Sequence, residues 1–185
     1  MTNKIVAVVG MCGSGKSEIT NYFSESGYFR VHFGDLTFQE VKRKGLELNE
    51  ANERIVREEL RNKYGLASYA IQLLPVITEA VISSDVVLDG LYSWSEYKFL
   101  KENFGSDLVV LAVVANHQIR AERLSLRLVR PLTLREVESR DISEVENLEK
   151  GGPIARADYY ILNNTTKTEM RRQFEEFLRW MQNQK

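Results

Sequence analysis

The sequence predicts an α/β fold in which helices cover both faces of a doubly wound, five-stranded parallel sheet. Three observations lead to this fold class. Short apolar runs rich in β-branched residues recur along the chain, and they indicate strands buried on both faces. Segments with helical spacing of apolar residues separate these runs. Glycines mark several of the boundaries.

The first half of the chain begins with a strand and then becomes mainly helical. Residues 4–9 form a continuous apolar run, and residues 16–26 follow with helical spacing. Residues 28–33 are predicted to form the second strand. The stretch 37–83 is predicted to hold two or three helices and no strand.

The second half continues the alternation. Gly151 and Gly152 are expected to break the chain before the last strand. No linker rich in Pro, Gly or Ser divides the sequence, so we expect a single domain over residues 1–185. The predicted strands are 85–89, 107–114 and 158–162, and the predicted helices are 93–103, 116–129, 133–149 and 167–183.

Composition narrows the class of partner. The chain carries 25 basic and 26 acidic residues, a formal net charge of -1, so a nucleic-acid partner is not expected. Cys12 is the only cysteine, which suits a reducing cytoplasm. No apolar run is long enough to predict a membrane span. The oligomeric state stays open.

The segment G-M-C-G-S-G-K-S at residues 10–17 matches the phosphate-loop pattern G-x-x-x-x-G-K-[ST] at every fixed position. It follows a predicted strand and opens a predicted helix, which is the context the motif requires. Lys16 is expected to reach the terminal phosphates and Ser17 to bind Mg²⁺. The alternative is a glycine turn with a surface lysine. The residues expected to contact the nucleotide are Gly10, Cys12, Gly13, Ser14, Gly15, Lys16 and Ser17.

Cys12 lies inside this loop at a variable position. A nucleophilic role needs a base such as histidine nearby, and the sequence places none there. We therefore interpret Cys12 as a small residue tolerated in a nucleotide-binding loop.

Two aspartates end predicted strands. Asp89 closes the run D-V-V-L-D, where a carboxylate beside the phosphate loop can hold Mg²⁺; the alternative is an Asp-Gly turn. Asp35 follows the second strand and is placed to orient an acceptor as a base or hydroxyl partner, or else to cap the next helix. The aromatic cluster at 92–97 lines an acceptor pocket or packs the following helix.

Four arginines fall at three- and four-residue steps between residues 120 and 130. On a helix they share one face, and arginines on a closing segment can stabilise the charge of a transferred phosphoryl group. Arg123 is predicted to bind the nucleotide, and Arg127 and Arg130 are predicted to be catalytic. The alternative is a solvated basic face paired with acidic residues at 136, 138 or 141.

The order of three segments resembles the P-loop nucleotide and nucleoside kinases: the loop itself, F-G-D at 33–35 and V-L-D-G at 87–90. Residues 117–130 (HQIRAERLSLRLVR) and 156–163 (RADYYILN) are similar to segments of dephospho-coenzyme A kinase. An uncharacterised group of adenylate-kinase-related proteins is also similar, through K-Y-G at 63–65, S-R-D at 139–141 and I-A-R-A-D-Y at 154–159.

This resemblance implies an acceptor-binding helical insert at about 36–83, an arginine-bearing lid at about 127–140, and ATP with Mg²⁺ as the donor. The sequence departs from both patterns at the acceptor side. Dephospho-coenzyme A kinases usually carry more acidic residues after the second strand than the single Asp35, and the D-G-x-P-R form of adenylate kinases is replaced by D-G-L-Y-S at 89–93. The acceptor is thus left open between dephospho-coenzyme A and a nucleoside monophosphate.

The leading functional hypothesis is an ATP-dependent small-molecule kinase that transfers the γ-phosphoryl group to a nucleotide-like acceptor. A regulatory ATPase or nucleotide-dependent switch without such an acceptor is the alternative. A kinase of RNA or DNA is disfavoured by the near-neutral charge. No guanine-reading motif is evident, and the choice between ATP and GTP stays open.

Overall fold

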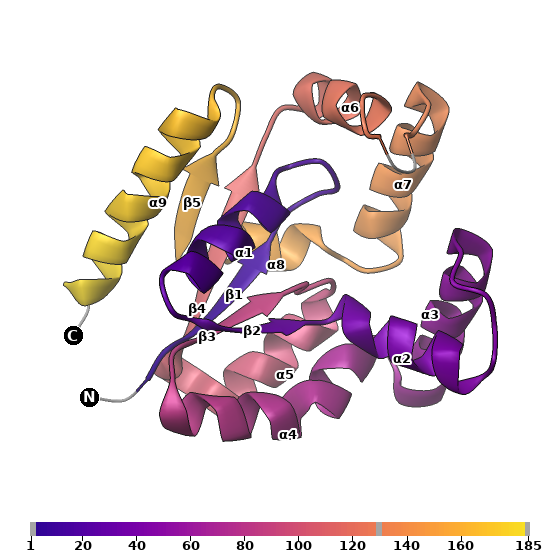
Figure 1. The fold of residues 1–185 in the computed structure, drawn as a ribbon, viewed down its shortest axis with the longest axis horizontal. Coiled ribbons are helices and arrows are strands. Elements are labelled where there is room, and N and C mark those ends of the chain that lie inside the picture. Colours follow the sequence, from indigo (N-terminus) through magenta and orange to yellow (C-terminus); the bar gives the residue numbers. More distant parts are fainter. Residues whose placement is uncertain (1–2, 129–130, 184–185) are drawn as a thin grey trace.

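The computed structural model describes residues 3–128 and 131–183. Its centre is a sheet of five parallel strands in the order β2-β3-β1-β4-β5 (Figure 1). This confirms the predicted doubly wound α/β fold. The strands are β1 (Ile5–Val9), β2 (Phe29–His32), β3 (Val86–Asp89), β4 (Leu108–Val114) and β5 (Tyr159–Leu162).

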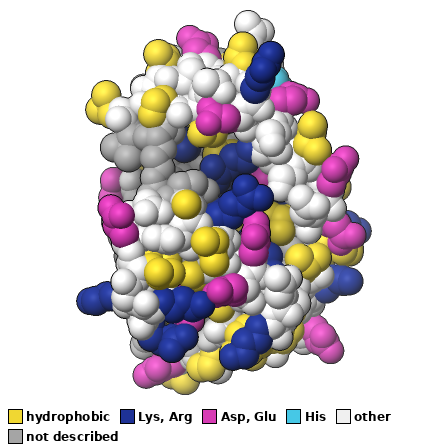
Figure 2. All heavy atoms as spheres, turned by 90° about the vertical axis from the view of Figure 1, so that its right-hand side faces the viewer, with side chains coloured by type: hydrophobic (Ala, Val, Ile, Leu, Met, Phe, Trp, Pro, Cys, Tyr) yellow, Lys and Arg dark blue, Asp and Glu magenta, His cyan; other side chains and the backbone are white. Residues whose placement is uncertain are grey.

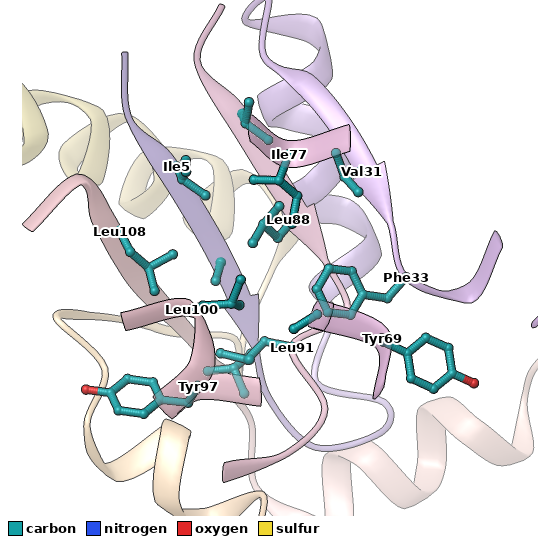
Figure 3. Close-up of a cluster of buried hydrophobic side chains, with 14 of the residues drawn as sticks. Ile5, Val31, Phe33, Tyr69, Ile77, Leu88, Leu91, Tyr97, Leu100 and Leu108 are labelled. Atoms are coloured by element: carbon teal, nitrogen blue, oxygen red, sulfur yellow. The ribbon is translucent and has the colours of Figure 1, made fainter. Parts of the chain in front are cut away.

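The two faces of the sheet bury alternate residues of each strand, as strand geometry requires. On one face, Ile5, Leu88 and Leu108 pack with Tyr69 and other residues of the helices that cover this face (Figure 3). On the other face, the alternate positions pack against the first and last helices. Because both faces are covered, the central strands β1 and β4 are apolar throughout, as the sequence predicted, whereas the outer strand β2 contains Arg30 and His32. The second set includes Val6, Val8, Val87, Leu111, Val113, Phe23, Phe174 and Phe177.

The helices surround the sheet in two layers. Figure 1 shows α1 and α9 on one side, and α4, α5 and α8 on the other. Three helices, α2 to α4, fill the stretch between β2 and β3. The helix bounds are α1 (Lys16–Glu25), α2 (Gly34–Arg43), α3 (Glu50–Tyr64), α4 (Ser68–Ser83), α5 (Trp94–Phe104), α6 (His117–Ser125), α7 (Leu134–Glu146), α8 (Gly151–Ala155) and α9 (Lys167–Gln182), with a 3-10 turn at Gly105–Asp107.

Three predicted boundaries were wrong. The helix predicted over 116–129 ends at Ser125, because the chain turns back and Leu132 N–H donates to Leu124 O at 3.1 Å. The next helix then starts afresh with a capping box at Thr133. The glycine pair expected to break the chain opens the short helix α8 instead.

The third wrong boundary concerns α2, which begins at Gly34. Asp35 therefore lies in the first turn of this helix, and Phe33 occupies the N-cap position. The N-cap interpretation of Asp35 is thus wrong. Its carboxylate still lies at the favourable positive end of the helix dipole.

Among the described residues, no single helix is long and apolar enough to cross a membrane. Taken together, Ala51–Tyr64 and Ser68–Ser83 have the length and apolar composition of a span, but a bend of 84° separates them.

Candidate phosphate-binding site

The phosphate loop follows the central strand. The chain passes to one side of β1 for β2 and β3 and to the other side for β4 and β5, so the loop lies at the switch point of the sheet. Ligands of open α/β sheets bind at this position, beyond the carboxyl ends of the strands.

Two glycines of the loop have no room for a side chain. A Cβ at Gly10 would lie 2.3 Å from Val113 O, and one at Gly15 would lie 2.2 Å from Asn163 Nδ2. Gly15 also has a φ of 101°, which residues with a side chain rarely adopt. The loop therefore packs directly on the ends of β4 and β5.

The loop presents unpaired donors. The backbone amides of Gly13, Gly15, Lys16 and Ser17 donate to no acceptor within 3–128 and 131–183, and the buried Ser14 hydroxyl also has no partner there. The last two amides lie at the positive end of α1. Free amides converging at a helix N-terminus form an anion site. These donors fit the phosphates of a nucleotide.

The Lys16 ammonium folds back over the loop. Its Nζ donates to Gly10 O at 2.8 Å and to Met11 O at 3.0 Å. Burial, together with the nearby charge of Lys150, lowers the pKa of Lys16 to about 8. An anion bound in the loop would supply a negative charge to accompany this half-buried ammonium.

Asp89 lies at the carboxyl end of β3, beside the loop, because it is in register with Val8 of β1. Its buried Oδ2 accepts a hydrogen bond from Arg30 Nε at 3.1 Å and lies 3.3 Å from Thr20 Oγ1. The Thr20 hydroxyl is also 3.2 Å from Ser17 O. Thr20 thus links the two residues predicted to bind Mg²⁺, whereas the Arg30 contact was not predicted.

No group of three or more His, Cys, Asp or Glu side chains suited to a metal is found in the described part of the chain. Mg²⁺ at kinase sites is held by one or two protein oxygens together with substrate phosphates and water. The sparse donor set of Ser17 and Asp89 fits that mode of binding.

Asp35 lies 2.7 Å from His32 Nδ1, and its side chain is 58% exposed. Both residues are at the carboxyl end of β2, two strands from β1. This places the carboxylate at the carboxyl end of the sheet, where the phosphate loop also lies. It is accessible there to a second ligand.

An aromatic cluster of Phe33, Tyr69 and Tyr92 lies at the same edge. Tyr92 packs edge-on against both other rings, with centroids 6.1 and 5.8 Å away. The Arg61 guanidinium lies 5.7 Å from the Tyr69 centroid, and Lys150 Nζ lies 5.6 Å from that of Tyr92. The cluster therefore lies between α3 and α4 on one side and Lys150, which pairs with Glu144 beside the loop, on the other. Trp94 and Tyr97 stack on each other within α5, which confirms the packing interpretation of residues 92–97, and the acceptor-pocket interpretation stays a prediction.

Glu96 is buried beneath this cluster. It accepts hydrogen bonds from the amides of Tyr92 at 2.7 Å and Ser93 at 3.1 Å, and it completes the capping box of α5. Burial raises the pKa of Glu96 to about 7 in spite of these bonds. The S-x-x-E spacing was the sequence signal for this residue.

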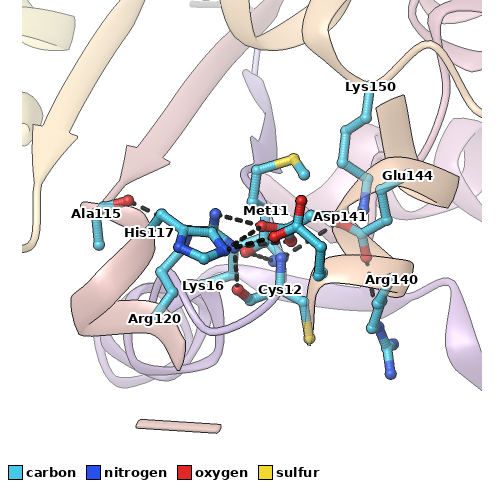
Figure 4. A network of polar contacts seen from close by, with 11 residues as sticks. Met11, Cys12, Lys16, Ala115, His117, Arg120, Arg140, Asp141, Glu144 and Lys150 are labelled. Atoms are coloured by element: carbon cyan, nitrogen blue, oxygen red, sulfur yellow. Dashed lines mark hydrogen bonds and ion pairs between the residues drawn. The ribbon is translucent and has the colours of Figure 1, made fainter. Parts of the chain in front are cut away.

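Arg120 and Arg123, two arginines of the predicted basic helix, make different contacts. Arg120 is buried and bonds to Asp141 at 2.9 and 2.6 Å and to Cys12 O at 3.0 Å (Figure 4). It therefore attaches α7 to the loop. Arg123 bonds to Asn163 Oδ1 at 3.3 Å, and its buried Nη1 has no partner among the described residues.

Of the two predicted catalytic arginines, the structure describes only Arg127. Arg127 is exposed and follows the end of α6, so it does not share the helical face of Arg120 and Arg123. The single-face prediction is wrong for this residue, because α6 ends a turn earlier than expected. Arg130 lies outside the described residues.

A buried ion pair next to the loop was not predicted. Glu144 Oε2 accepts the Cys12 amide at 3.2 Å and lies 2.9 Å from Lys150 Nζ (Figure 4). Burial opposes ionisation of Glu144, but the charges of Lys150 and Lys16 outweigh it and hold the pKa of this carboxyl below its usual value. No local motif signals these residues, since Cys12 and Glu144 are 132 positions apart.

Figure 2 shows Lys and Arg side chains gathered around a hollow on the side of the molecule that carries α2, α3 and α7. A separate pocket of about 550 Å³ lies between α2, α3 and α4. Its charged residues already pair, as Arg43 with Glu40 and Lys44 with Glu59, and it includes no residue of the phosphate loop. This pocket is therefore distinct from the candidate phosphate-binding site.

The parallel sheet and the loop define a P-loop protein of the nucleotide kinase class, as the resemblance implied. A family model described as "AAA domain" matches residues 6–146. The shikimate kinase of Bacteroides thetaiotaomicron superposes with a TM-score of 0.62 and 12% identity, covering 97% of this chain and 98% of that one. A gluconokinase of Sinorhizobium meliloti gives 0.52 and 18%, covering 96% of each chain. At these identities the likeness concerns the fold.

The particular family follows from a closer relative. A UPF0200 protein of Thermococcus sibiricus is 33% identical over 175 residues, which cover 92% of each chain. The chain belongs to the UPF0200 family and carries the AAA domain.

Proposed function

We propose that this protein is an ATP-dependent kinase that transfers the γ-phosphoryl group to a nucleotide-like small molecule. The observation that supports this most strongly is the loop itself. Free amides, the Lys16 ammonium and the Asp89 carboxylate meet at one edge of the sheet, next to an accessible second carboxylate at Asp35. Phosphoryl transfer requires this combination of charge and positioning.

On the donor side, the loop amides and Lys16 are proposed to bind the β- and γ-phosphates, and Arg123 is proposed to add its unpaired Nη1. Ser17 and Asp89 are the proposed ligands of Mg²⁺, which neutralises phosphate charge when bound. Arg30 would have to share Asp89 Oδ2 or leave it.

On the acceptor side, Asp35 is proposed to orient the attacking hydroxyl or phosphate, with His32 fixing the carboxylate. The helical stretch at about 36–83 is the proposed acceptor-binding insert. Its Arg61, together with the half-buried Tyr92, offers positive charge and an aromatic ring, which suit an anionic group and a base, while the buried Tyr69 packs against Tyr92. This supports a nucleotide-like acceptor, either dephospho-coenzyme A or a nucleoside monophosphate, over a nucleic acid.

The segment 127–140, which includes Arg127 and Arg130, is proposed to act as a lid that excludes water during transfer. The lone cysteine, buried in the loop, suits a reducing cytoplasm, where ATP is also available.

The test is ADP release from Mg-ATP by the purified protein, alone and with a panel of acceptors. The panel contains dephospho-coenzyme A, AMP, CMP, UMP and several nucleosides. Lys16→Ala is the inactive reference, and Lys98→Ala, which changes an exposed lysine of α5, is the matched control. Stimulation by one acceptor that Lys16→Ala abolishes and Lys98→Ala preserves is the expected result.

A nucleotide-dependent switch is the second candidate, because α7 contacts the loop directly through Glu144 and Arg120. Slow ADP release that no acceptor changes would favour this alternative over the kinase.

A further inference from the structure

Glu144 occupies a position suited to an anion. Its Oε2 accepts the amide of Cys12, inside the phosphate loop, at 3.2 Å, and it also pairs with Lys150 at 2.9 Å (Figure 4). A loop amide and an ammonium group are the donors that phosphate oxygens bind. The carboxylate thus makes the kind of contacts that a phosphate oxygen would make.

Lys150 is too deeply buried to be a surface lysine. It is 3% exposed, and Glu144 is 8% exposed. A buried ammonium is stable only when a negative group accompanies it. The Tyr92 ring, 5.6 Å away, adds a cation–π contact but no neutralising charge. Glu144 is the carboxylate that pairs with Lys150 in the described structure.

Lys16 belongs to the same cluster. The charge of Lys150 disfavours the protonated form of Lys16, and the charge of Glu144 favours it. One carboxylate therefore lies near both Lys16 of the phosphate loop and the buried Lys150. Without it, two cations would face each other in a site with little access to water.

We propose that Glu144 is an internal substitute for the terminal phosphate of the nucleotide, and that Lys150 is a further phosphate-binding residue that exchanges Glu144 for that phosphate. The inference rests on the proposed function, since it assumes that the loop binds a triphosphate. The exchange breaks no covalent bond: Glu144 releases Lys150 and the Cys12 amide, and the phosphate accepts both.

The charges favour this exchange. A phosphate monoester carries about -1.5 to -2 charges and three acceptor oxygens, more than one carboxylate offers. It can therefore accompany Lys16 and Lys150 together. Because Glu144 lies on α7, its release also detaches one contact of this helix from the loop, while the Arg120–Asp141 pair remains.

The test compares Mg-ATP affinity, by isothermal titration calorimetry, in the wild type and two variants of equal size. Glu144→Gln removes the competing charge, and we expect it to tighten binding about five-fold or more. Lys150→Met removes the proposed phosphate contact, and we expect binding about ten-fold weaker. Lys98→Met, on the exposed face of α5, is the matched control and leaves the affinity unchanged.

Thermal unfolding provides a readout that is independent of activity. Glu144→Gln is expected to lower the midpoint without ligand, because Lys150 loses its partner, and ATP is expected to raise it by more than in the wild type. The double variant Glu144→Gln/Lys150→Met removes both charges, so it regains the ligand-free midpoint yet binds ATP weakly. If a single variant does not fold, this double variant still tests the proposal.

An equal or weaker ATP affinity in Glu144→Gln would overturn the role of Glu144 as a competitor, and an unchanged affinity in Lys150→Met would overturn that of Lys150. Inorganic tripolyphosphate separates this inference from the kinase proposal. If tripolyphosphate binds more tightly to Glu144→Gln and more weakly to Lys150→Met, and no acceptor is phosphorylated, the inference holds and the kinase proposal is rejected. If an acceptor is phosphorylated but the affinities of the two variants for ATP and tripolyphosphate equal those of the wild type, the kinase proposal holds and the inference is rejected. If neither ATP nor tripolyphosphate binds, both are rejected.

Discussion

Gly15 is held between the loop and Asn163, whose amide cannot easily move. Asn163 Nδ2 donates to Ser14 O at 2.8 Å, and its Oδ1 accepts from Arg123. A Cβ at Gly15 would lie 2.2 Å from that nitrogen. The loop conformation thus depends on a contact between residues that are distant in sequence.

Gly15→Ala should lower the free energy of unfolding by about 2–5 kcal/mol, the sum of left-handed strain and crowding. Gly27→Ala is the matched control, because Gly27 has a similar φ of 88° and no atom within 4 Å of its added Cβ. It should cost only about 1–2 kcal/mol. Urea unfolding measures both, and equal losses would contradict the crowding.

Glu96 should make stability depend on pH. Its pKa of about 7 in the folded protein exceeds the usual value of 4.5, so the folded state binds the proton more tightly. Its contribution is fully present below about pH 4.5 and is lost as pH rises through about 7.

Urea unfolding of the wild type and Glu96→Gln at pH 5 and pH 7.5 tests this. The wild type should lose about 1–3 kcal/mol relative to the variant between these values, because other groups titrate alike in both. An equal change in the free energy of unfolding between the two pH values in both proteins would show that the pKa of Glu96 is not raised.

Single residues also show the limits of the sequence. Lys16, Ser17 and Asp89 could be placed because a local motif and a strand end specify them. Glu144 and Lys150 could not, since their contacts with the loop depend on how α7 packs. Arg120 was recognised as one of a basic series, but its attachment to Asp141 needed the orientation of two helices.

Among the elements, α7 is held on the loop by polar contacts and by a small apolar cluster in which Val137 packs with Cys12. The Arg120–Asp141 pair has side chains only 7% and 14% exposed, so neither charge is well hydrated. Arg120 also bonds to Cys12 O. The position of α7 and the shape of the loop are therefore coupled.

Asp141→Asn should cost about 3 kcal/mol of stability, because it leaves the Arg120 charge buried with a weakened partner. Asp107→Asn is the control, since its pair with Lys4 is more exposed and should cost less than about 1 kcal/mol. Urea unfolding gives both values. Limited proteolysis should also cleave Asp141→Asn faster next to α7, and equal cleavage of the two variants would contradict the coupling.

The elements themselves were largely predictable. Buried strands and the loop gave strong local patterns, and all five strands lie where they were predicted within a residue or two. The end of α6 was not predictable, because the backbone bond from Leu132 to Leu124 and the capping box at Thr133 together decide it. The bounds of an acceptor insert and a lid remain predictions.

For the whole molecule, the sheet places the loop, Asp89 and Asp35 along one edge, and the helices α2, α3 and α7 lie on the same side as the basic hollow. A ligand bound there would contact both halves of the chain. Nucleotide should therefore stabilise the entire fold.

Mg-ATP at about 100 times its dissociation constant should add about 2.7 kcal/mol and raise the thermal midpoint by roughly 5–10 °C. Lys16→Ala should lose most of this shift, whereas Lys98→Ala should retain it. Differential scanning fluorimetry measures the shifts, and equal shifts in both variants would place the nucleotide away from the loop.

The most direct measurement of the central claim is transfer of the labelled phosphoryl group from γ-³²P-ATP to each acceptor of the panel, with products separated and identified by mass. The account predicts label on one nucleotide-like acceptor, in wild type and Lys98→Ala but not in Lys16→Ala. Label released only as inorganic phosphate, whichever acceptor is present, would contradict a kinase.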